Sequence, residues 1–349
     1  MRVAPGLLAQ VGSIARDVAP AHRYAVISDS NVAPLYGNQI VDSLGKDAVD
    51  LFLIPAGETN KTRDTWARLT DQMLAKNYGR DSAVIALGGG VVGDLAGFVA
   101  ATFMRGVPIV QVPTTLMAMV DASIGGKTAV DTPAGKNLVG VFHFPAAVVV
   151  DPQVLATLPL REMRAGFAEI VKHGVIANEP YLREVAGSAQ QLLGKAGPDS
   201  DTMLSVIVRS IEIKADIVSR DEREDGLRKT LNFGHTIGHA VELVSGYSLL
   251  HGEAVAIGMA LEGRLAERVG VARAGTADAI TNALQAVGLP TELPQPFDRD
   301  AVLEAIGSDK KGRAGKMRFA LPSAIGAMAG AETGWTVSVG DDQLREVLA

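Results

Sequence analysis

The sequence predicts an α/β domain built on a parallel sheet over residues 1–157, followed by a mainly α-helical domain over residues 158–349. Two observations carry this prediction. Through the first part of the chain, short apolar runs alternate with segments of helical periodicity, which is typical of βαβ units. From about residue 158 onward, the apolar positions recur mostly at helical spacing. A chain of 349 residues is long enough for two such domains.

Short apolar runs predict the strands of the first domain. These runs are residues 24–27, 49–54, 82–87, 109–112 and 147–150. Helical spacing between them predicts a helix over residues 62–76, in which Trp66, Leu69 and Met73 share one face. A second helix is predicted over residues 94–102. This alternation favours a parallel sheet covered by helices.

Helical periodicity dominates the second domain. The predicted helices span residues 160–175, 203–220, 235–244, 253–269 and 276–287. Near the end of the chain, the apolar run 317–321 predicts a strand. We therefore expect a helical domain that contains little sheet.

The composition excludes several classes of protein. Hydrophobic residues make up 47% and charged residues 21% of the chain, which argues against disorder. A net charge of −6 disfavours nonspecific nucleic-acid binding, although a local basic cluster can still bind an anionic small molecule. Because the chain has no cysteine, a metal ion would have to be bound by His, Asp or Glu.

The first residues and the apolar runs predict a location. The N-terminal segment lacks the basic-then-apolar pattern of a signal peptide. No apolar run reaches the ~18 residues expected of a membrane helix. We therefore expect a cytoplasmic protein without a membrane partner.

A glycine-rich loop follows the strand predicted at 82–87. Residues 88–93 match G-x-G-x-x-G between a strand and a helix, where glycines let backbone N–H groups approach a pyrophosphate. Two features weaken this interpretation, because at least two strands precede the loop and a triple glycine also suits a tight turn. After the next strand, Thr114 and Thr115 would suit a ligand contact, but capping of the next helix is favoured.

Three of the six histidines lie in one short stretch, at His235, His239 and His251. His235 and His239 are four residues apart, which is a metal-ligand spacing on a helix and equally the spacing of two polar residues lining a cleft. A catalytic zinc ion needs three protein ligands. The candidate carboxylates are Glu169, Glu242 and Glu253. Glu169 lies in an apolar stretch, and its alternative partner is Lys172.

Basic residues are spread along both domains. Residues 125–128 (GGKT) resemble the end of a Walker A loop, but Asp121 stands where that motif requires glycine, so the motif fails. Each lysine alone is typical of a solvated surface. Together the basic residues suit a substrate that bears a phosphate and a carboxylate. They are Lys127, Lys136, Lys214, Arg228, Lys310 and Lys311.

Taken in order, six segments resemble the 3-dehydroquinate synthase family, within the sugar-phosphate cyclases. They are GGGVVGDLAGF, VPTTLMAMVDASIGGKTAVD, AGKNLVG, AGFAEIVKHG, LNFGHTIGHAVE and HGEAVAIGM. The resemblance runs from about residue 24 to about residue 325. It implies a parallel α/β NAD-binding domain followed by a helical metal-binding domain. It also implies a redox-neutral cyclisation of a seven-carbon keto sugar-acid phosphate with release of phosphate, a step of aromatic amino acid biosynthesis.

The resemblance also implies roles for individual residues. A zinc or cobalt ion would be held by Glu169, His235 and His251, with His239 an active-site residue rather than a ligand. NAD would be contacted by Asp29, Asn31, Glu58, Lys61, Gly89, Gly90, Val91, Val92, Gly93, Asp94, Thr114, Thr115, Lys127, Lys136 and Thr157. Substrate contacts and catalysis would involve Asp121, Lys127, Lys136, Asn137, Lys172, Lys214, Arg228, Asn232, His239 and Lys310 or Lys311. Arg105 would reach the substrate phosphate across the interface of a homodimer.

Two departures and three alternatives accompany this hypothesis. The segment before Pro5 is shorter than in the family, where it forms an early strand, and Asp131 stands where synthases often have Asn. A metal-dependent polyol or alcohol dehydrogenase shares the fold, but a neutral polyol needs no cluster of Lys and Arg. A sister sugar-phosphate cyclase would not need the pair Lys214 and Arg228 for a substrate carboxylate. A non-catalytic binding protein is disfavoured because all three metal ligands implied by the resemblance are retained.

Overall fold

A computed structural model describes residues 1–195, 197–198, 200–309 and 317–348. The chain divides into two compact units, Met1–Leu158 and Pro159–Ala349. The boundary predicted from the sequence lies one residue earlier.

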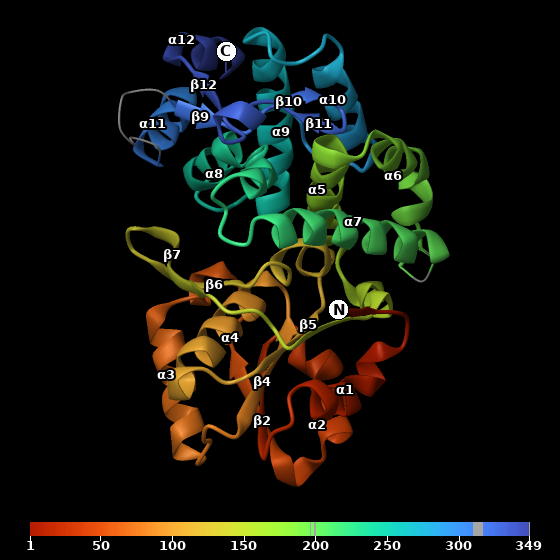
Figure 1. The fold of residues 1–349 in the computed structure, drawn as a ribbon, viewed down its shortest axis with the longest axis vertical. Helices are drawn as coiled ribbons and strands as arrows, with labels where there is room; N and C mark the ends of the chain where they lie inside the picture. The colour runs from red at the N-terminus through yellow and green to blue at the C-terminus, as the bar shows by residue number, and fades with distance from the viewer. Residues whose placement is uncertain (196, 199, 310–316, 349) are drawn as a thin grey trace. The chain divides into compact units, whose positions relative to one another are not determined.

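The first unit is built on a six-stranded sheet in the order β1-β8-β5-β4-β2-β3 (Figure 1). Every neighbouring pair in it is parallel. All residues of the central strand β4 are buried, as expected where helices cover both faces of a parallel sheet. The strands are β1 (Arg2–Val3), β2 (Arg23–Asp29), β3 (Val49–Ile54), β4 (Ser82–Gly88), β5 (Ile109–Pro113) and β8 (Ala147–Val150).

Four helices accompany this sheet. They are α1 (Val11–Val18), α2 (Asn38–Leu44), α3 (Arg63–Ala75) and α4 (Gly90–Thr102). Side chains of α3 and α4 join residues of β2, β3, β4 and β5 in one hydrophobic core. In Figure 1, α1 and α2 lie on the other side of the sheet from α3 and α4. The sequence therefore predicted the sheet and the layer of α3 and α4, although α4 begins at Gly90 rather than at Asp94. Helices α1 and α2 were not predicted.

Besides α1 and α2, two further features of the first unit were not predicted from the sequence. Residues 2 and 3 form the edge strand β1, which pairs with β8, so a short early strand is present. Strands β6 (Lys127–Thr132) and β7 (Gly135–Phe142) form a separate antiparallel hairpin. Glycines and lysines interrupt the apolar pattern of this hairpin, and this hid its strands.

The second unit is mainly helical, as predicted. Its helices are α5 (Leu160–Ala177), α6 (Glu179–Leu192), α7 (Asp201–Arg220), α8 (His235–Val244), α9 (His251–Arg268), α10 (Thr276–Ala286), α11 (Arg299–Asp309) and α12 (Asp341–Leu348). Its short strands are β9 (Met317–Phe319), β10 (Pro322–Ala324), β11 (Ala327–Met328) and β12 (Val337–Val339). One core gathers apolar side chains of α8, α9, α11, β9 and α12. Helices α6, α11 and α12 were not predicted.

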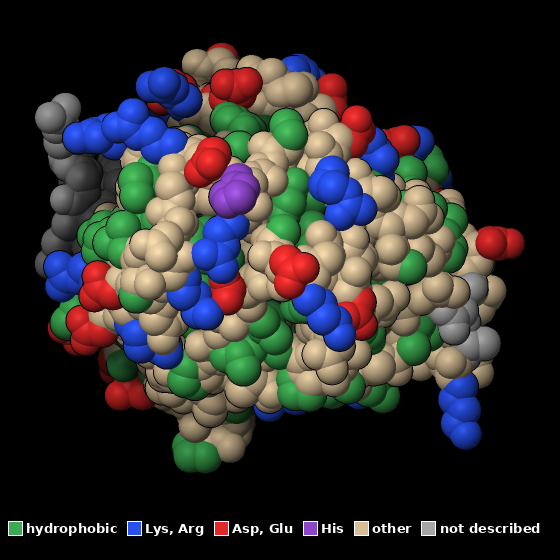
Figure 2. All heavy atoms as spheres, turned by 90° about the horizontal axis from the view of Figure 1, so that it is seen from below, with side chains coloured by type: hydrophobic (Ala, Val, Ile, Leu, Met, Phe, Trp, Pro, Cys, Tyr) green, Lys and Arg blue, Asp and Glu red, His purple; other side chains and the backbone are tan. Residues whose placement is uncertain are grey.

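The charge of the surface bears on nucleic-acid binding, and the length and polarity of the helices bear on membrane insertion. Figure 2 shows a face on which basic and acidic side chains are interspersed rather than gathered into a basic stripe. Within the described ranges, every helix is too short or too polar to cross a bilayer.

Candidate active site

The sheet of the first unit has a switch point between β2 and β4. From β2 the chain moves outward to β3, and then returns to β4 on the opposite side of β2. Ligands of open α/β sheets bind beyond the carboxyl ends of strands at such a point. Asp29 ends β2, and Gly88 ends β4 at the start of the glycine loop. The two predicted nucleotide-binding segments therefore meet at this edge of the sheet.

The glycine loop leads directly into α4, and β5 ends beside it. Gly88 accepts a hydrogen bond of 2.9 Å from the backbone N–H of Thr114. A Cβ atom on Gly89 would lie 3.1 Å from Cγ2 of Thr115, so a side chain there would crowd the neighbouring strand end. The two threonines differ in role. Thr115 accepts from the N–H of Ala118, as the capping hypothesis expected, whereas the buried Thr114 hydroxyl has no protein partner among the described residues.

Lys61 is the centre of a charged cluster that includes several predicted cofactor contacts. Its side chain is 3% exposed, and its ammonium group lies 2.7 Å from Glu58 and 3.4 Å from Asp94. Burial alone would lower the pKa of Lys61, but Asp94 and Glu58 raise it above its usual value. Burial raises the pKa of Asp94 to about 6, against the opposing effect of Lys61. Lys61 therefore stays protonated beside Asp94 of α4.

Arg105 lies in a strained turn after α4. Met104 and Arg105 have φ angles of 52° and 69°, and Gly106 follows with 116°. Left-handed conformations are unfavourable for residues with a side chain, and they are concentrated at functional sites. The Arg105 side chain is exposed. This backbone geometry was not predicted from the sequence.

The remaining predicted contacts of the first unit differ in their surroundings. Lys127 is exposed at the start of β6, and Asp121 is half-buried in the short helical turn Ala118–Ala122. The Thr157 hydroxyl lies 2.7 Å from the Tyr36 hydroxyl and donates to the carbonyl of Val154. Its polar partners are therefore the carbonyl of its own turn and the hydroxyl of the distant residue Tyr36.

The three histidines that are close in the sequence of the second unit are also close in space. Ligand atoms of His235, His239 and His251 all lie within 4.8 Å of one another. The rings of His235 and His239 are 5.2 Å apart, and those of His235 and His251 are 5.3 Å apart. Glu169 Oε1 lies 3.6 Å from His235 Nε2. Three imidazoles and a buried carboxylate suit a divalent metal ion in a chain without cysteine.

Close helix packing brings these histidines together. His235 begins α8 and His251 begins α9. A Cβ atom on Gly258 would lie only 2.0 Å from the carbonyl oxygen of Gly234, and one on Gly252 only 2.0 Å from that of Ala165. Glycine at these two positions is therefore a steric requirement for the approach of α9 to α8 and α5.

A carboxylate from α9 fixes the start of α8. The fully buried side chain of Glu262 accepts hydrogen bonds from the N–H groups of Gly234, at 2.7 Å, and Ile237, at 2.9 Å. These are the unsatisfied donors at a helix N-terminus, where negative charge is also favourable. Glu262 thereby positions His235. This role of Glu262 was not predicted, although Glu262 stands in an apolar stretch as Glu169 does.

The structure gives different surroundings to the three candidate carboxylate ligands. Glu169 is buried and forms an ion pair with Lys172. Glu242 Oε2 lies 3.2 Å from Nδ1 of His251, a contact that favours a proton on Nδ1 and leaves Nε2 to bind a metal. Glu253 makes two 2.7 Å contacts with Arg161. Of these three, Glu169 is the carboxylate placed beside His235.

The electrostatics favour neutral imidazole at the cluster. The pKa of His235 lies well below its usual value because of burial and the nearby charge of Lys172. A neutral imidazole has the lone pair that metal binding requires. The donor set and its protonation therefore fit a zinc or cobalt ion.

Three predicted basic residues are buried in this unit. Lys172 is on α5, Lys214 is on α7, and Arg228 is in the turn Leu227–Asn232. These elements contact one another. Lys172 pairs with Glu169, and Arg228 donates to the carbonyl oxygen of Glu222. Three cations on neighbouring elements suit an anionic ligand.

A carboxylate beside the predicted residue Asn232 was also missed. The Asn232 side chain donates a 2.5 Å hydrogen bond to Glu224 Oε1. Glu224 has a φ of 63°. It lies in a loop where the Asp221 carboxylate accepts hydrogen bonds from the N–H groups of Gly226 and Arg228. The polar, charged sequence of this loop resembled an ordinary surface connection. The predicted Lys310 and its neighbour Lys311 lie outside the described residues.

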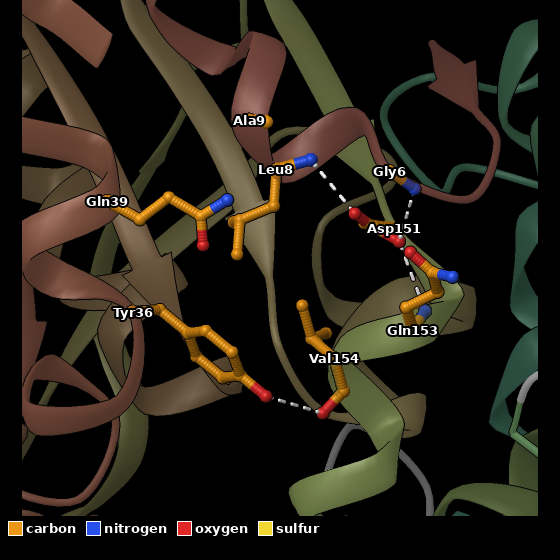
Figure 3. A pocket seen from close by; sticks show the side chains of 8 residues that line it. All are labelled: Gly6, Leu8, Ala9, Tyr36, Gln39, Asp151, Gln153 and Val154. Carbon is orange, nitrogen blue, oxygen red and sulfur yellow. Dashed lines mark hydrogen bonds between the residues drawn. The ribbon is translucent and has the colours of Figure 1, made fainter. Parts of the chain in front are cut away.

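A cavity of about 200 Å³ in the first unit contains none of the predicted site residues (Figure 3). Its Asp151 carboxylate accepts hydrogen bonds from the N–H groups of Gly6, Leu8 and Gln153. These bonds tie the N-terminal segment to the end of β8. The cavity is a structural junction rather than part of the candidate site.

Comparison with known families covers most of the chain. Residues 51–165 match the family described as 3-dehydroquinate synthase N-terminal, and residues 166–312 match 3-dehydroquinate synthase C-terminal. A 3-dehydroquinate synthase of Rippkaea orientalis is 45% identical over 327 residues, covering 93% of this chain and 89% of that protein. One of Xylella fastidiosa is 46% identical over 334 residues, with the same coverage.

Solved structures share the fold. A 2-deoxy-scyllo-inosose synthase complexed with carbaglucose-6-phosphate, NAD+ and Co2+ has a TM-score of 0.89 at 29% identity, covering 99% of this chain and 95% of that chain. The 2-epi-5-epi-valiolone synthase ValA from Streptomyces hygroscopicus, with NAD+ and Zn2+ bound, has a TM-score of 0.85 at 31% identity, with 99% and 94% coverage. A probable glycerol dehydrogenase from Sinorhizobium meliloti, at 18% identity and a TM-score of 0.66, shares the fold alone. The predicted fold class is confirmed.

Proposed function

This chain belongs to the 3-dehydroquinate synthase family, and from that premise we infer the reaction that it catalyses. It is a phosphorus–oxygen lyase that converts 3-deoxy-D-arabino-heptulosonate 7-phosphate to 3-dehydroquinate and phosphate in the shikimate pathway. The observation that carries this conclusion is identity of about 45% with curated synthases over 93% of the chain. The dehydrogenase alternative has only a likeness of fold, and the sister cyclases are less similar in sequence.

The enzyme uses NAD and a divalent metal ion, as the two cyclases solved with NAD+ and Co2+ or Zn2+ do. We propose that Glu169, His235 and His251 hold the metal and that His239 faces the substrate. When bound, the metal supplies Lewis acidity and NAD supplies hydride chemistry. The proximity of the three rings and the low pKa of His235 support this proposal.

The cofactor contacts proposed in the first unit surround the switch point of the sheet. The glycine loop and the N-terminus of α4 would bind the pyrophosphate through backbone N–H groups. Asp29 and Asn31 would contact a ribose from the end of β2, and the Thr114 hydroxyl would gain its missing partner. The cluster of Glu58, Lys61 and Asp94 would complete the site.

The substrate contacts proposed in the second unit are buried cations and their neighbours. Lys214 and Arg228 would bind the substrate carboxylate, and Lys172 would orient the substrate near the metal. His239 would move a proton, because it is the most exposed of the three clustered histidines and the resemblance does not make it a ligand. Asn232 is held by Glu224 for a further polar contact.

We also propose a homodimer in which Arg105 serves the partner subunit's site. Among the residues that the structure describes, strand β7 pairs only with β6, and it exposes a row of apolar side chains. Such a patch is typical of an interface. Leu138 and Phe142 are 64% and 46% exposed, so Leu138→Asp with Phe142→Asp should yield a monomer in analytical ultracentrifugation. If the double variant sediments with the same mass as the native assembly, this interface is contradicted. The cytoplasmic location stays a prediction.

A phosphate-release assay with the heptulosonate phosphate, NAD and zinc tests the function. Phosphate should form without net NADH, whereas NADH accumulating in proportion to substrate would identify a dehydrogenase instead.

Arg228→Ala should raise KM for the acid phosphate at least about tenfold. Arg220→Ala is the matched control, because Arg220 is exposed and pairs with Asp216 on α7. Arg228→Lys replaces Arg228→Ala in the assay if the latter does not fold.

A further inference from the structure

The tip of the β6–β7 hairpin is attached to the segment around Lys61 through Asp131. The backbone N–H of Asp131 donates a 2.7 Å hydrogen bond to the carbonyl oxygen of Lys61. Thr62 and Asp131 form an isolated parallel bridge. The hairpin register shifts between Val130 and Thr132, so Asp131 stands at an irregularity of the strand. Irregular strand positions commonly redirect a side chain toward a site.

The Asp131 carboxylate fixes the backbone of Asn137. Its Oδ1 accepts a 2.9 Å hydrogen bond from the Asn137 N–H. Asn137 has a φ of 58°, in the left-handed region that residues with a side chain seldom adopt without local support. In this conformation the Asn137 side-chain oxygen accepts a 2.8 Å hydrogen bond from Lys61 Nζ. Asp131 Oδ1 itself lies 3.6 Å from the same ammonium group.

Lys61, Asn137 and Asp131 thus form a closed ring of contacts. Each member touches the other two, and the ring joins the hairpin to the segment that follows β3. Lys61 is almost fully buried, so its position depends on the groups that surround it. Replacement of Asp131 by a residue without a side-chain acceptor would remove the hydrogen bond that holds the Asn137 N–H. It would also remove one of the carboxylates that lie near Lys61 Nζ.

Neighbouring charges make the carboxylate of Asp131 unusual. Burial and the negative charge of Glu58 raise the pKa of Asp131, although the Asn137 N–H and Lys61 oppose them. Lys136, on the same hairpin, lies 3.8 Å from Glu58. The hairpin tip is therefore held to Glu58 and Lys61 by groups on both of its strands.

We propose that Asp131 is a positioning residue for the reaction, which holds Asn137 and Lys61 in the orientation that binds substrate and cofactor. The inference rests on the proposed function of Asn137 and Lys61 as ligand contacts. Asp131 itself touches neither ligand. Its role is to accept the Asn137 N–H, and an amide oxygen can do the same. The charge of Asp131 is therefore of secondary importance, and its hydrogen-bonding oxygen is essential.

Steady-state kinetics of the NAD- and zinc-loaded enzyme test the inference. Asp131→Ala should raise KM for the heptulosonate phosphate by about tenfold, with kcat changed less than about twofold, because one positioning hydrogen bond is lost. Asp131→Asn should restore KM to near the native value. Thr132→Ala is the matched control, since it removes the 3.2 Å hydrogen bond to Gly135 O within the same hairpin without touching Lys61 or Asn137. Asp131→Ser replaces Asp131→Ala if the latter does not fold.

Amide hydrogen exchange and a fourth variant separate the possible failures. In Asp131→Ala the Asn137 amide should exchange faster than in the native enzyme and in Asp131→Asn. If Asn137→Ala raises KM but Asp131→Ala leaves both KM and this exchange unchanged, the positioning role is overturned and the ligand contact stands. If Asn137→Ala also leaves KM unchanged, the proposed contact of Asn137 fails, and with it the catalytic meaning of Asp131. If Thr132→Ala raises KM by a similar factor, the effect of Asp131→Ala comes from a general loss of order in the hairpin. That result would overturn the inference.

Discussion

Glu262 on α9 reaches the N-terminus of α8, where its Oε2 atom accepts a 2.7 Å hydrogen bond from the backbone N–H of Gly234. The same side chain accepts from Ile237, so a residue of one helix caps another. His235 lies between these two donors in the sequence. The cap therefore couples the stability of the second unit to the geometry of the histidine cluster.

Replacement of Glu262 by Ala should lower the free energy of unfolding by about 2–4 kcal/mol, because two buried N–H groups lose their acceptor. Glu262→Gln should have a smaller effect, since one amide oxygen remains. Urea denaturation measures the change, and Glu212→Ala on the exposed face of α7 is the control. Zinc affinity, measured by competition with a chelator, should also fall in Glu262→Ala. Equal stability of the two Ala variants would contradict the capping role.

Gly258→Ala should be strongly destabilising, by more than about 3 kcal/mol, because its Cβ would lie 2.0 Å from Gly234 O. Gly187 on α6 is a matched control, since a Cβ there meets nothing within 4 Å. Gly187→Ala should stabilise the protein by about 0.5–1 kcal/mol through helix propensity. Thermal unfolding of both variants gives the comparison. A well-folded Gly258→Ala enzyme with full metal content would refute the packing argument.

His251→Ala should abolish activity and remove most of the bound metal, because the site loses one of three ligands. Metal content per chain is measured by mass spectrometry after dialysis against a weak chelator. Glu242→Gln should keep the metal but weaken its affinity about 10- to 100-fold, as expected when the partner of a ligating imidazole is changed. His22→Ala provides the control for loss of an exposed histidine. Full activity of His251→Ala without metal would disprove the assignment.

Asp94 predicts a pH dependence of stability. Its pKa is raised by burial to about 6 in the folded protein, from an ordinary value near 3.8. The folded state therefore holds this proton more tightly than the unfolded state between about pH 4 and pH 6. Stability from this group is fully present below pH 4 and is lost as the pH rises through 6. Relative to Asp94→Asn, the native protein should lose at most about 3 kcal/mol across that window.

Urea denaturation at several pH values between 4 and 7 measures this difference. Asp64→Asn, at an exposed position in the first turn of α3, controls for loss of one surface carboxylate. Parallel pH profiles for the native protein and Asp94→Asn would show that Asp94 titrates normally.

The sequence predicted most of the fold because its strands are short apolar runs and its main helices are periodic. Strand β4 was predicted as residues 82–87 and spans Ser82–Gly88. The start of α4 was misplaced because glycine is a weak helix former, yet Gly90 already lies in the first turn. The β6–β7 hairpin was missed because its β7 residues are all half-buried or exposed and show no alternation.

The site was predictable where one residue type carries the chemistry. The three clustered histidines could be recognised in the sequence as candidate metal ligands, and the structure brings their side chains together. Glu262, Glu224 and Asp131 act through contacts with residues 6 to 28 positions away. No local pattern specifies such contacts, since they depend on helix packing and on left-handed backbone angles.

The close contact between Gly258 and Gly234 has a consequence for metal selection in the cell. Backbone packing, rather than the ion, sets the spacing of α8 and α9, so the imidazoles are gathered before any ion arrives. A metal site assembled in this way selects weakly among the first-row divalent metal ions, because nitrogen and oxygen donors bind several of these ions. We expect the ion found in enzyme purified from its host to follow the intracellular supply of zinc and cobalt.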